Sequence, residues 1–167
     1  MKIDYSDRYQ KSIHDFLIKN NLTLATAESC TGGLLGDLIT NIPGSSEYYK
    51  GGLIAYDNEI KIDILKIKRE TMNIYGAVSS EVASEMAENI RDMMQVDIGI
   101  AITGIAGPGG GDSKKPVGLT YISLCSTDLP KTKEFIWHDN RRENKENSAV
   151  QALKILQKYL ENRFKKE

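Results

Sequence analysis

Hydrophobic residues recur at helical spacing in three stretches of the chain, each of which predicts an amphipathic helix. The first stretch ends near Asn20 and Asn21 and contains Tyr9, Ile13, Phe16 and Leu17. The second follows Ser79 or Ser80, either of which would cap the helix, and contains Val82, Ala83, Met86, Ala87, Ile90, Met93 and Met94. The third is a long C-terminal helix marked by Ala149, Ala152, Leu153, Leu156 and Leu160.

Short apolar runs between these helices predict strands over residues 22–27, 51–56 and 97–103. Residues 117–125 and 133–137 predict two further strands, joined as a hairpin across 126–131. Short helices are expected over 32–40, before the breakers Pro43 and Gly44, and from about 58 to 65. Helices interleaved with strands and one hairpin predict a single three-layer α/β/α domain over 1–167, with a mixed, mostly parallel central sheet.

Composition narrows the class of protein. The chain has 167 residues, of which 40% are hydrophobic and 27% charged, as in one ordinary globular domain. The net charge of −1 gives no strong nucleic-acid signal, so any anion site must be local. No apolar run approaches the roughly 20 residues of a membrane span. Two cysteines and two histidines have no metal-ligand spacing, so we expect a cytoplasmic, reduced protein without metal or cofactor.

The segment ATAESCTGG (residues 25–33) predicts a strand that breaks into a turn and re-enters as a helix. Such a turn directs unpaired backbone N–H groups and the positive end of the helix toward one point. It could hold a phosphate or the oxyanion of a tetrahedral intermediate, or it could be a capped helix start with glycines in a tight turn. The spacing is not that of a P-loop.

Two adjacent side chains in this turn are candidate nucleophiles. Ser29 needs a base, whereas Cys30 usually needs a histidine partner. His14 falls on the first helix, which leaves His138, at the end of a distant strand, as the only histidine available to Cys30. The alternative for Cys30 is a small buried side chain that fills the core.

Tyr56 and Lys61 follow in GGLIAYDNEIK, where Tyr56 is expected to end a strand and Lys61 to lie in the first turn of a helix. A helix start is unfavourable for a cation, and partial burial would lower the pKa of the amine enough for it to act as a base. Ser–Lys hydrolases use such a lysine, often with a tyrosine hydroxyl in the proton path. The alternative is a solvated lysine beside an aromatic residue at a strand end.

A glycine-rich loop, TGIAGPGGGDSKKPVG (residues 103–118), follows a predicted buried strand at the sheet edge where α/β proteins bind ligands. It lacks the pattern of a dinucleotide-binding turn, and it is either a ligand loop or a long connection. Arg141, Arg142 and Lys145 precede the last helix and could hold a phosphate or form a solvated face.

Taken in order, ATAESCTGG, IPGSSEYYKGGLIAYDNEIK, GAVS and ITGIAGPGGG…KPVG resemble the C-terminal domain of the CinA family over residues 22–156. The resemblance implies a nicotinamide-nucleotide amidase, a serine amidohydrolase of pyridine nucleotide salvage. Such an enzyme converts nicotinamide mononucleotide and water to nicotinate mononucleotide and ammonia. The resemblance places the catalytic roles on Ser29, Tyr56 and Lys61, with Ser29 as nucleophile and the other two as proton-transfer groups.

The resemblance also implies a set of substrate-binding positions around the pocket. They are Thr31, Gly32, Gly33, Ser45, Ser46, Thr103, Gly104, Arg141 and Lys145. Lys145 stands where the family often has a second arginine, and lysine offers a point charge in place of a planar fork. Backbone N–H groups of residues 31–33, joined by Gly104 or Ile105, are expected to stabilise the oxyanion.

Three further expectations remain open at this stage. Only about twenty residues precede the matching region, so the ADP-ribose pyrophosphatase activity associated with an additional N-terminal domain is expected to be absent. The methionine-rich apolar faces fit a homodimer or simply the core. The alternatives to the amidase are an inactive competence-associated binding or assembly module, or an amidase for a related nucleotide amide.

Overall fold

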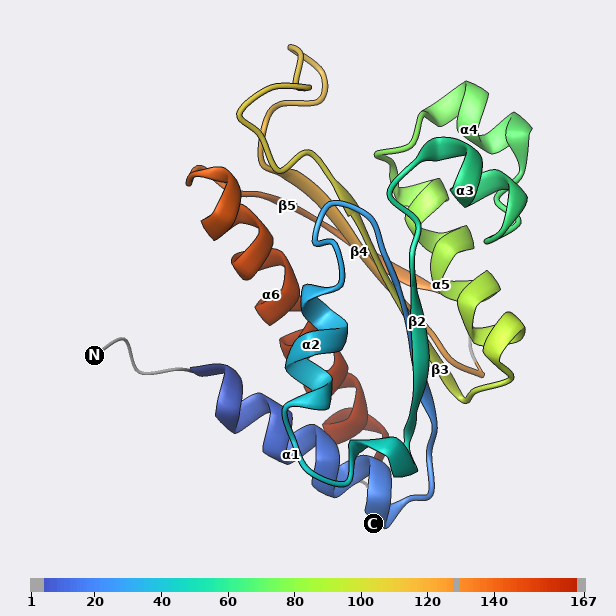
Figure 1. Cartoon of the computed structure of the whole chain (residues 1–167), viewed down its shortest axis with the longest axis vertical. Helices are drawn as coiled ribbons and strands as arrows, with labels where there is room; N and C mark the ends of the chain where they lie inside the picture. The colour runs from blue at the N-terminus through green and yellow to red at the C-terminus, as the bar shows by residue number, and fades with distance from the viewer. Residues whose placement is uncertain (1–4, 128–129, 165–167) are drawn as a thin grey trace.

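Five strands form one sheet in the order β2-β1-β3-β4-β5 (Figure 1). The computed structural model describes residues 5–127 and 130–164. The strands are β1 Leu24–Glu28, β2 Tyr49–Ile54, β3 Ile98–Gly104, β4 Leu119–Cys125 and β5 Lys131–Ile136. The helices are α1 Tyr5–Lys19, α2 Leu34–Thr40, α3 Asn58–Asp63, α4 Arg69–Tyr75, α5 Ser80–Met94 and α6 Arg141–Phe164, with a 3₁₀ turn η1 at Ser45–Glu47.

Strand directions confirm the mixed, mostly parallel sheet. β1 pairs in parallel with β2 and β3, while β4 runs antiparallel to both β3 and β5. β4 is therefore the one strand of this sheet that points the other way among the described residues. The carboxyl ends of β1, β2, β3 and β5 consequently lie at the same edge, where parallel sheets usually bind ligands.

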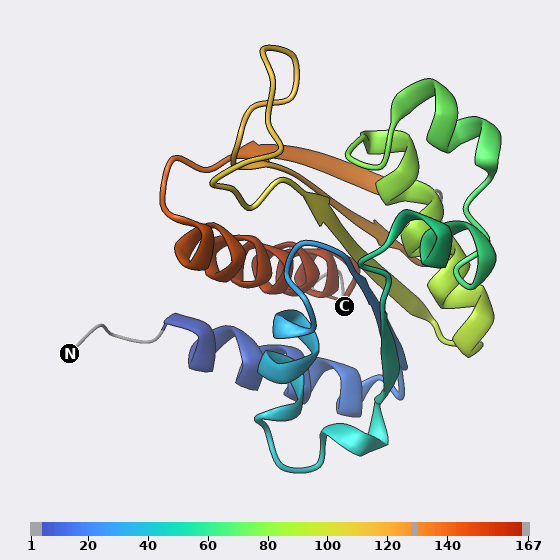
Figure 2. The same ribbon diagram turned by 45° about the horizontal axis from the view of Figure 1, so that its top comes forward.

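Helices cover both faces of the sheet, which confirms the three-layer prediction. Figures 1 and 2 show α1, α2 and α6 on one face and α3, α4 and α5 on the other. Each face has its own apolar core. The first contains Ile13, Leu17, Leu35, Ile100, Leu153 and Leu156. The second contains Ala27, Leu65, Val82, Met86, Ile90 and Ala101.

Helix α5 follows the predicted pattern closely. Ser79 caps it, with its hydroxyl accepting a hydrogen bond from the N–H of Val82. Of the predicted apolar face, Met86 is fully buried, whereas Met93 is 42% exposed. Met94 packs against the core as predicted, so Met93 is the one residue of the predicted face that is exposed.

Several boundaries differ from the prediction. The strand expected over 51–56 is β2, which ends at Ile54, so Tyr56 lies in the following loop. Helix α4 was not predicted, because its sequence carries little apolar periodicity and Ile74 and Tyr75 are exposed. The expected hairpin loop 126–131 joins β4 and β5, but residues 128 and 129 lie outside the described residues.

Helix α6 begins at Arg141, two turns before its apolar stripe. The side-chain oxygen of Asn140 accepts hydrogen bonds from the backbone N–H groups of Arg142 and Glu143, at 3.0 and 3.1 Å. This side-chain cap lets a polar segment start the helix. Both Arg141 and Lys145 are thereby carried on a rigid element.

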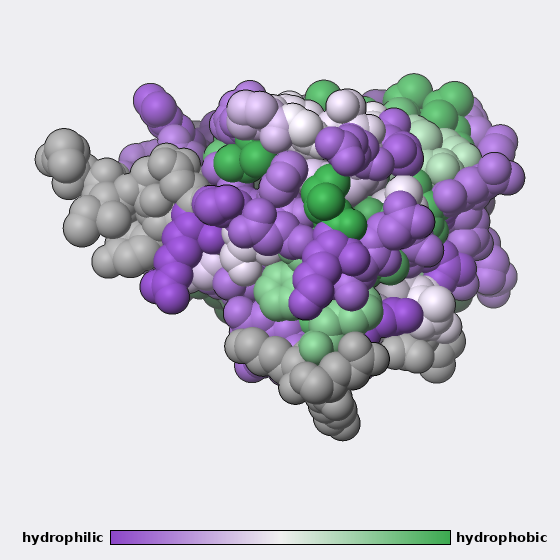
Figure 3. Space-filling view, turned by 90° about the horizontal axis from the view of Figure 1, so that it is seen from below, coloured by the Kyte–Doolittle hydropathy of each residue, from purple (hydrophilic) through white to green (hydrophobic). Residues whose placement is uncertain are grey.

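The surface is largely polar. The face seen in Figure 3 is mostly hydrophilic, with hydrophobic residues in small separate groups. Among the described helices, none is both long and apolar enough to span a lipid bilayer.

Candidate active site

Ser29 directly follows the carboxyl end of β1, which lies between β2 and β3 in the sheet. Its N–H donates to the carbonyl of Ile102 at 2.9 Å, which extends the strand pairing by one residue. Its own carbonyl accepts from the N–H of Gly32 at 3.1 Å, which closes a tight turn. Gly32 and Gly33 have φ angles of +66° and +99°, a backbone conformation that favours glycine. Ser29 is thus held in a fixed position by backbone contacts on both sides.

A buried carboxylate occupies the start of the helix that follows. Glu28 is 2% exposed, and its side chain accepts hydrogen bonds from the N–H groups of Gly33, Leu35 and Gly36 at 3.1, 3.0 and 2.8 Å. The carboxylate neutralises the positive end of α2. The expectation that residues 32 and 33 offer free N–H groups to an oxyanion is therefore wrong.

Two other backbone N–H groups, directly after Ser29 in the turn, are available to an oxyanion. Within residues 5–127 and 130–164, neither the N–H of Cys30 nor that of Thr31 donates to another residue, and the Cys30 N–H interacts with its own thiol. Ile105 was a further candidate donor, but its N–H donates to the carbonyl of Leu119 at 2.8 Å. Cys30 and Thr31 are consequently the candidate oxyanion donors.

Ser29, Tyr56 and Lys61 line one pocket of about 260 Å³, together with Gly104 and Thr103. The pocket lies where the loops after β1, β2 and β3 meet. The Thr103 hydroxyl donates to the carbonyl of Ala77 at 2.8 Å, so it supports the pocket wall. A Cβ at Gly104 would lie 2.7 Å from the carbonyl oxygen of Leu119, so glycine is required there.

Lys61 is buried, with 1% of its surface exposed. Its Nζ donates to the carbonyl of Tyr56 at 3.2 Å and lies 3.5 Å from the side-chain oxygen of Asn58. Burial removes water from the ammonium and lowers the pKa of Lys61, while nearby Asp57 opposes this shift. Burial lowers this pKa in the predicted direction, but Lys61 lies in the last turn of α3 and not in the first, so a helix start is not the cause.

Tyr56 is 58% exposed and is held through its hydroxyl. Arg141 donates one hydrogen bond to this hydroxyl at 2.9 Å and another to the carbonyl of Gly107 at 2.7 Å. The same tyrosine accepts from Lys61 through its backbone carbonyl. Tyr56 therefore connects the buried lysine with the start of α6.

Cys30 is a poor nucleophile in this environment. It is 7% exposed, and burial raises the pKa of its thiol to about 12. His138 is exposed and does not line this pocket. The structure therefore favours the reading of Cys30 as a core side chain.

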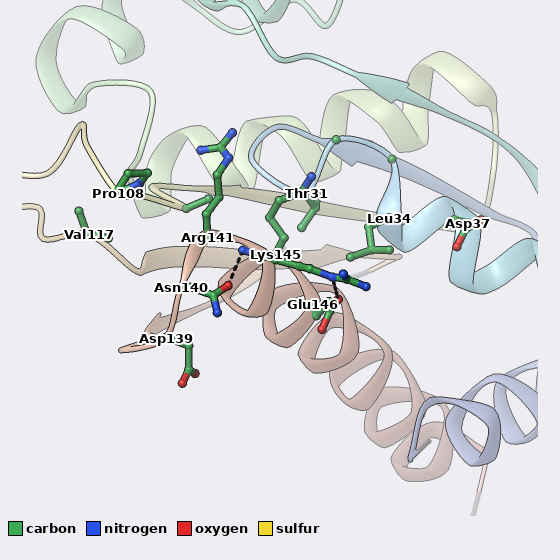
Figure 4. Close-up of a pocket in the computed structure, with 14 residues that line it drawn as sticks. Thr31, Leu34, Asp37, Pro108, Val117, Asp139, Asn140, Arg141, Lys145 and Glu146 are labelled. Atoms are coloured by element: carbon green, nitrogen blue, oxygen red, sulfur yellow. Dashed lines mark hydrogen bonds and ion pairs between the residues drawn. The ribbon is translucent and has the colours of Figure 1, made fainter. Parts of the chain in front are cut away.

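A second, larger pocket of about 1100 Å³ adjoins the first, with Arg141 lining both. Figure 4 shows Arg141 and Lys145 rising from the start of α6 toward the turn that carries Thr31. Lys145 Nζ lies 3.7 Å from where a Cβ on Gly32 would be. Thr31 is 1% exposed, and its hydroxyl oxygen has no hydrogen-bond partner among the described residues. Thr31 and Lys145 both line the larger pocket, so a cation and a residue with an unpartnered hydroxyl border the same space.

The glycine-rich loop forms the wall between β3 and α6. The side chain of Asn144 is buried and donates to the carbonyl of Ala106 at 3.0 Å. The N–H of Gly118 donates to the carbonyl of Ile105 at 2.7 Å and closes the base of the loop. The start of α6 and the loop are thus fixed relative to each other.

Ser45 and Ser46 are not brought to either pocket within one chain. They form η1, which precedes β2, whereas Ser29 follows β1. Since β1 and β2 are parallel, these segments lie at opposite ends of the sheet. No three His, Cys, Asp or Glu side chains of residues 5–127 and 130–164 lie together as a metal site would require.

Sequence reasoning missed two residues of the site. Glu28 is part of the ATAESCTGG motif, but its position in the sequence does not show that its side chain accepts three backbone hydrogen bonds at the start of α2. Asn58, beside Lys61, was treated only as the start of a helix. Both act through short-range polar contacts that depend on the exact path of the turn.

Comparison with known proteins identifies relatives of this domain. The family described as CinA C-terminal domain matches residues 6–160. A CinA-like protein of Dictyoglomus thermophilum is 45% identical over 153 residues, and a protein of Halothermothrix orenii that carries the competence-damage inducible name is 48% identical over 154 residues. Each alignment covers 92% of this chain. The chain spans 37% of the length of both relatives.

Solved structures share the whole architecture. A competence or damage-inducible protein from Enterobacter asburiae has a TM-score of 0.90 at 33% identity, covering 93% of this chain and 98% of its own. The Agrobacterium tumefaciens competence/damage inducible protein CihA has a TM-score of 0.87 at 36% identity, covering 93% and 94% of the two chains.

Proposed function

Because the chain belongs to the CinA C-terminal domain family, we propose that it is a serine amidohydrolase that converts nicotinamide mononucleotide and water to nicotinate mononucleotide and ammonia. One observation carries the proposal: Ser29 and a buried lysine of lowered pKa line the same pocket. A serine and an amine that can be neutral in the same pocket are the minimum that acyl transfer requires. No cofactor has a role in the proposed reaction.

The first half-reaction forms an ester. Neutral Lys61 takes the proton of the Ser29 hydroxyl as its oxygen attacks the carboxamide carbon. The carbonyl oxygen becomes an oxyanion, which the N–H groups of Cys30 and Thr31 stabilise. Lys61 then returns the proton to the amide nitrogen, the C–N bond breaks, and ammonia leaves. The product is a nicotinoyl ester of Ser29.

The second half-reaction uses water in the same way. Lys61 accepts a proton from water as the water oxygen attacks the ester carbon, and the proton returns to Ser29 when the acid departs. The Tyr56 hydroxyl, hydrogen-bonded to Arg141, lines this pocket and completes the proton path. Lysine and serine end in their starting states, so the cycle is closed.

The larger pocket provides a place for the ribose phosphate. Lys145 and Thr31 both line this pocket, and the buried hydroxyl of Thr31 has no hydrogen-bond partner among the described residues. Arg141, shared by both pockets, would lie between the phosphate and the reacting amide. A point charge with a hydroxyl can bind a phosphate without the arginine fork that relatives often have.

Ser29→Ala is the direct test. The variant should fold like the unmodified protein, with the same circular dichroism spectrum and melting temperature, and should release no ammonia from nicotinamide mononucleotide. Unchanged ammonia release would refute the proposal. To define the substrate, the same assay is run with nicotinamide, nicotinamide riboside and nicotinamide adenine dinucleotide. Faster turnover of one of these compounds would assign the activity to a related amide.

A further inference from the structure

A groove between β5 and α6 carries a concentration of positive charge that the proposed reaction does not use. The groove has a volume of about 630 Å³. We call it the basic groove and define it by its five cationic lining residues. These are Lys131, Lys133, Lys154, Lys158 and Arg163.

The described residues that line the basic groove include five cations and no carboxylate. All five cations are exposed, and the ion pairs between described residues lie elsewhere in the molecule. The whole chain has a net charge of −1, so this is a local excess. Lys154 and Lys158 are four residues apart on α6, a spacing at which like charges destabilise a helix. A lysine-rich edge strand deters aggregation, but this explains only the two lysines of β5.

The floor of the groove is apolar. Leu124 of β4 is buried there, and Ile155 and Tyr159 of α6 are half-buried. Helix α6 packs against α1 and α2 and, within the sheet, on β3 and β4, so the α6 side of β5 is left open beside it. The basic groove therefore has an apolar floor, with the lysines of β5 on one side and the cations of α6 on the other.

The basic groove is separate from the candidate active site. It lies along the second half of α6, whereas Arg141 and Lys145 belong to the first two turns. Thr127, which also lines it, follows β4, the strand that runs opposite to β1. The groove and Ser29 are therefore at opposite ends of the sheet.

We propose that the basic groove docks an acidic amphipathic segment of a partner protein. Apolar side chains of the segment would cover Leu124, Ile155 and Tyr159, and its carboxylates would face the lysines on both walls. An amphipathic acidic segment is complementary both to the apolar floor and to the positive charge of the basic groove. Charge complementarity thus defines the partner by its chemistry.

Single-stranded nucleic acid fits the groove less well. Such ligands are held by bases that stack on exposed aromatic rings along a basic path. Tyr159 is the one aromatic residue that lines the groove in the described part of the chain, and its hydroxyl is already bonded to Ser126 at 2.6 Å. The guanidinium of Arg163 lies 5.9 Å from the centroid of the same ring. The apolar side chains of the floor also cannot donate hydrogen bonds to the phosphates of a nucleic-acid backbone.

Fluorescence anisotropy tests the proposal with a defined probe. The probe is a fluorescein-labelled peptide of about 18 residues made of Glu, Leu and Ala, with Leu on one helical face. We expect saturable binding that weakens with salt, and a Kd about tenfold or more higher for the double variant Lys133→Glu/Lys158→Glu, which reverses one charge on each wall. A scrambled peptide of the same composition should bind more weakly than the probe.

Matched controls separate the groove from overall charge. Lys50→Glu/Lys66→Glu makes the same charge change at exposed positions outside the groove and should leave the Kd within about twofold. Melting temperatures show whether each variant is folded. No saturable binding, equal binding of the scrambled peptide, or an equal loss in the control variant would overturn the proposal. Tighter binding of a labelled oligothymidine that depends on Lys133 and Lys158 would also overturn it, in favour of nucleic acid.

Discussion

The guanidinium of Arg141 donates a hydrogen bond to the hydroxyl of Tyr56 at 2.9 Å, across 85 residues of sequence. Its other terminal nitrogen donates to the carbonyl of Gly107 at 2.7 Å. Because Arg141 lines both pockets, an anion bound in the larger pocket would attract the same guanidinium that holds Tyr56. We therefore expect that phosphate binding, as proposed for the larger pocket, would be linked to the position of Tyr56 through the Arg141 side chain.

Arg141→Lys tests this link. Lysine keeps the charge but cannot bond to both the Tyr56 hydroxyl and the Gly107 carbonyl with fixed geometry. Losing two hydrogen bonds of this kind should lower kcat/KM for nicotinamide mononucleotide by roughly 10–100-fold. Arg8→Lys is the matched control, since Arg8 is exposed on α1 and lines neither pocket, and it should stay within about twofold. Equal effects of the two variants would contradict the link.

Burial of Lys61 should make stability depend on alkaline pH. Its folded-state pKa is lowered, so below that pKa the buried ammonium destabilises the protein. As pH rises from the folded value toward the unfolded value near ~10.4, this destabilisation is relieved. Lys61→Met removes the titrating group and should raise the free energy of unfolding near neutral pH by about 1 kcal/mol, while abolishing ammonia release.

Urea unfolding between neutral pH and about pH 10 measures this effect. The stability advantage of Lys61→Met should shrink as the pH rises, because wild-type Lys61 loses its proton in the folded state while the unfolded state still keeps it. Lys66→Met replaces an exposed lysine and should show no such trend. A stability difference that stays constant with pH would show that burial of the charge is not its cause.

The sequence predicted the elements better than it predicted their ends. Periodic apolar residues located α1 and α5, since burial of one face requires the 3.6-residue repeat. The start of α6 was missed by two turns because the cap at Asn140, and not apolar periodicity, defines it. Tyr56 was placed at a strand end but lies two residues beyond β2. Boundaries depend on single hydrogen bonds, which a pattern does not contain.

The candidate site could be predicted only in part. Ser29, Tyr56 and Lys61 meet in one pocket because they follow or flank the carboxyl ends of neighbouring parallel strands. The role of Glu28 could not be predicted, since it depends on which N–H groups the turn directs inward. The separation of Ser45 and Ser46 from the pocket follows from the parallel direction of β1 and β2, which the sequence does not state.

Glu28→Gln should destabilise the protein through the start of α2. The amide keeps one acceptor oxygen and turns its NH₂ toward a backbone N–H, so at least one of the three hydrogen bonds is lost. We expect the free energy of unfolding to fall by about 2–3 kcal/mol. Asp37→Asn, an exposed change in the same helix, should cost under about 0.5 kcal/mol. Similar losses in both variants would mean that Glu28 acts only through the helix dipole.

Cys30→Ala should leave the reaction almost intact. A thiol with a pKa near 12 is protonated at neutral pH, so it cannot replace Ser29 as the nucleophile. We expect kcat to stay within roughly threefold and wild-type protein to resist iodoacetamide at pH 7. Loss of ammonia release in Cys30→Ala, with normal folding by circular dichroism, would transfer the chemistry to the cysteine.

Thr31→Val isolates the phosphate contact from the chemistry. The side chains have nearly the same shape, and the Thr31 hydroxyl has no partner among the described residues, so its removal should leave the protein equally stable or more stable. If the hydroxyl binds the substrate phosphate, KM for nicotinamide mononucleotide should rise about tenfold while kcat changes little. With nicotinamide riboside, which lacks the phosphate, wild type and variant should react alike. A loss of similar size on both substrates would place Thr31 at the reacting amide instead.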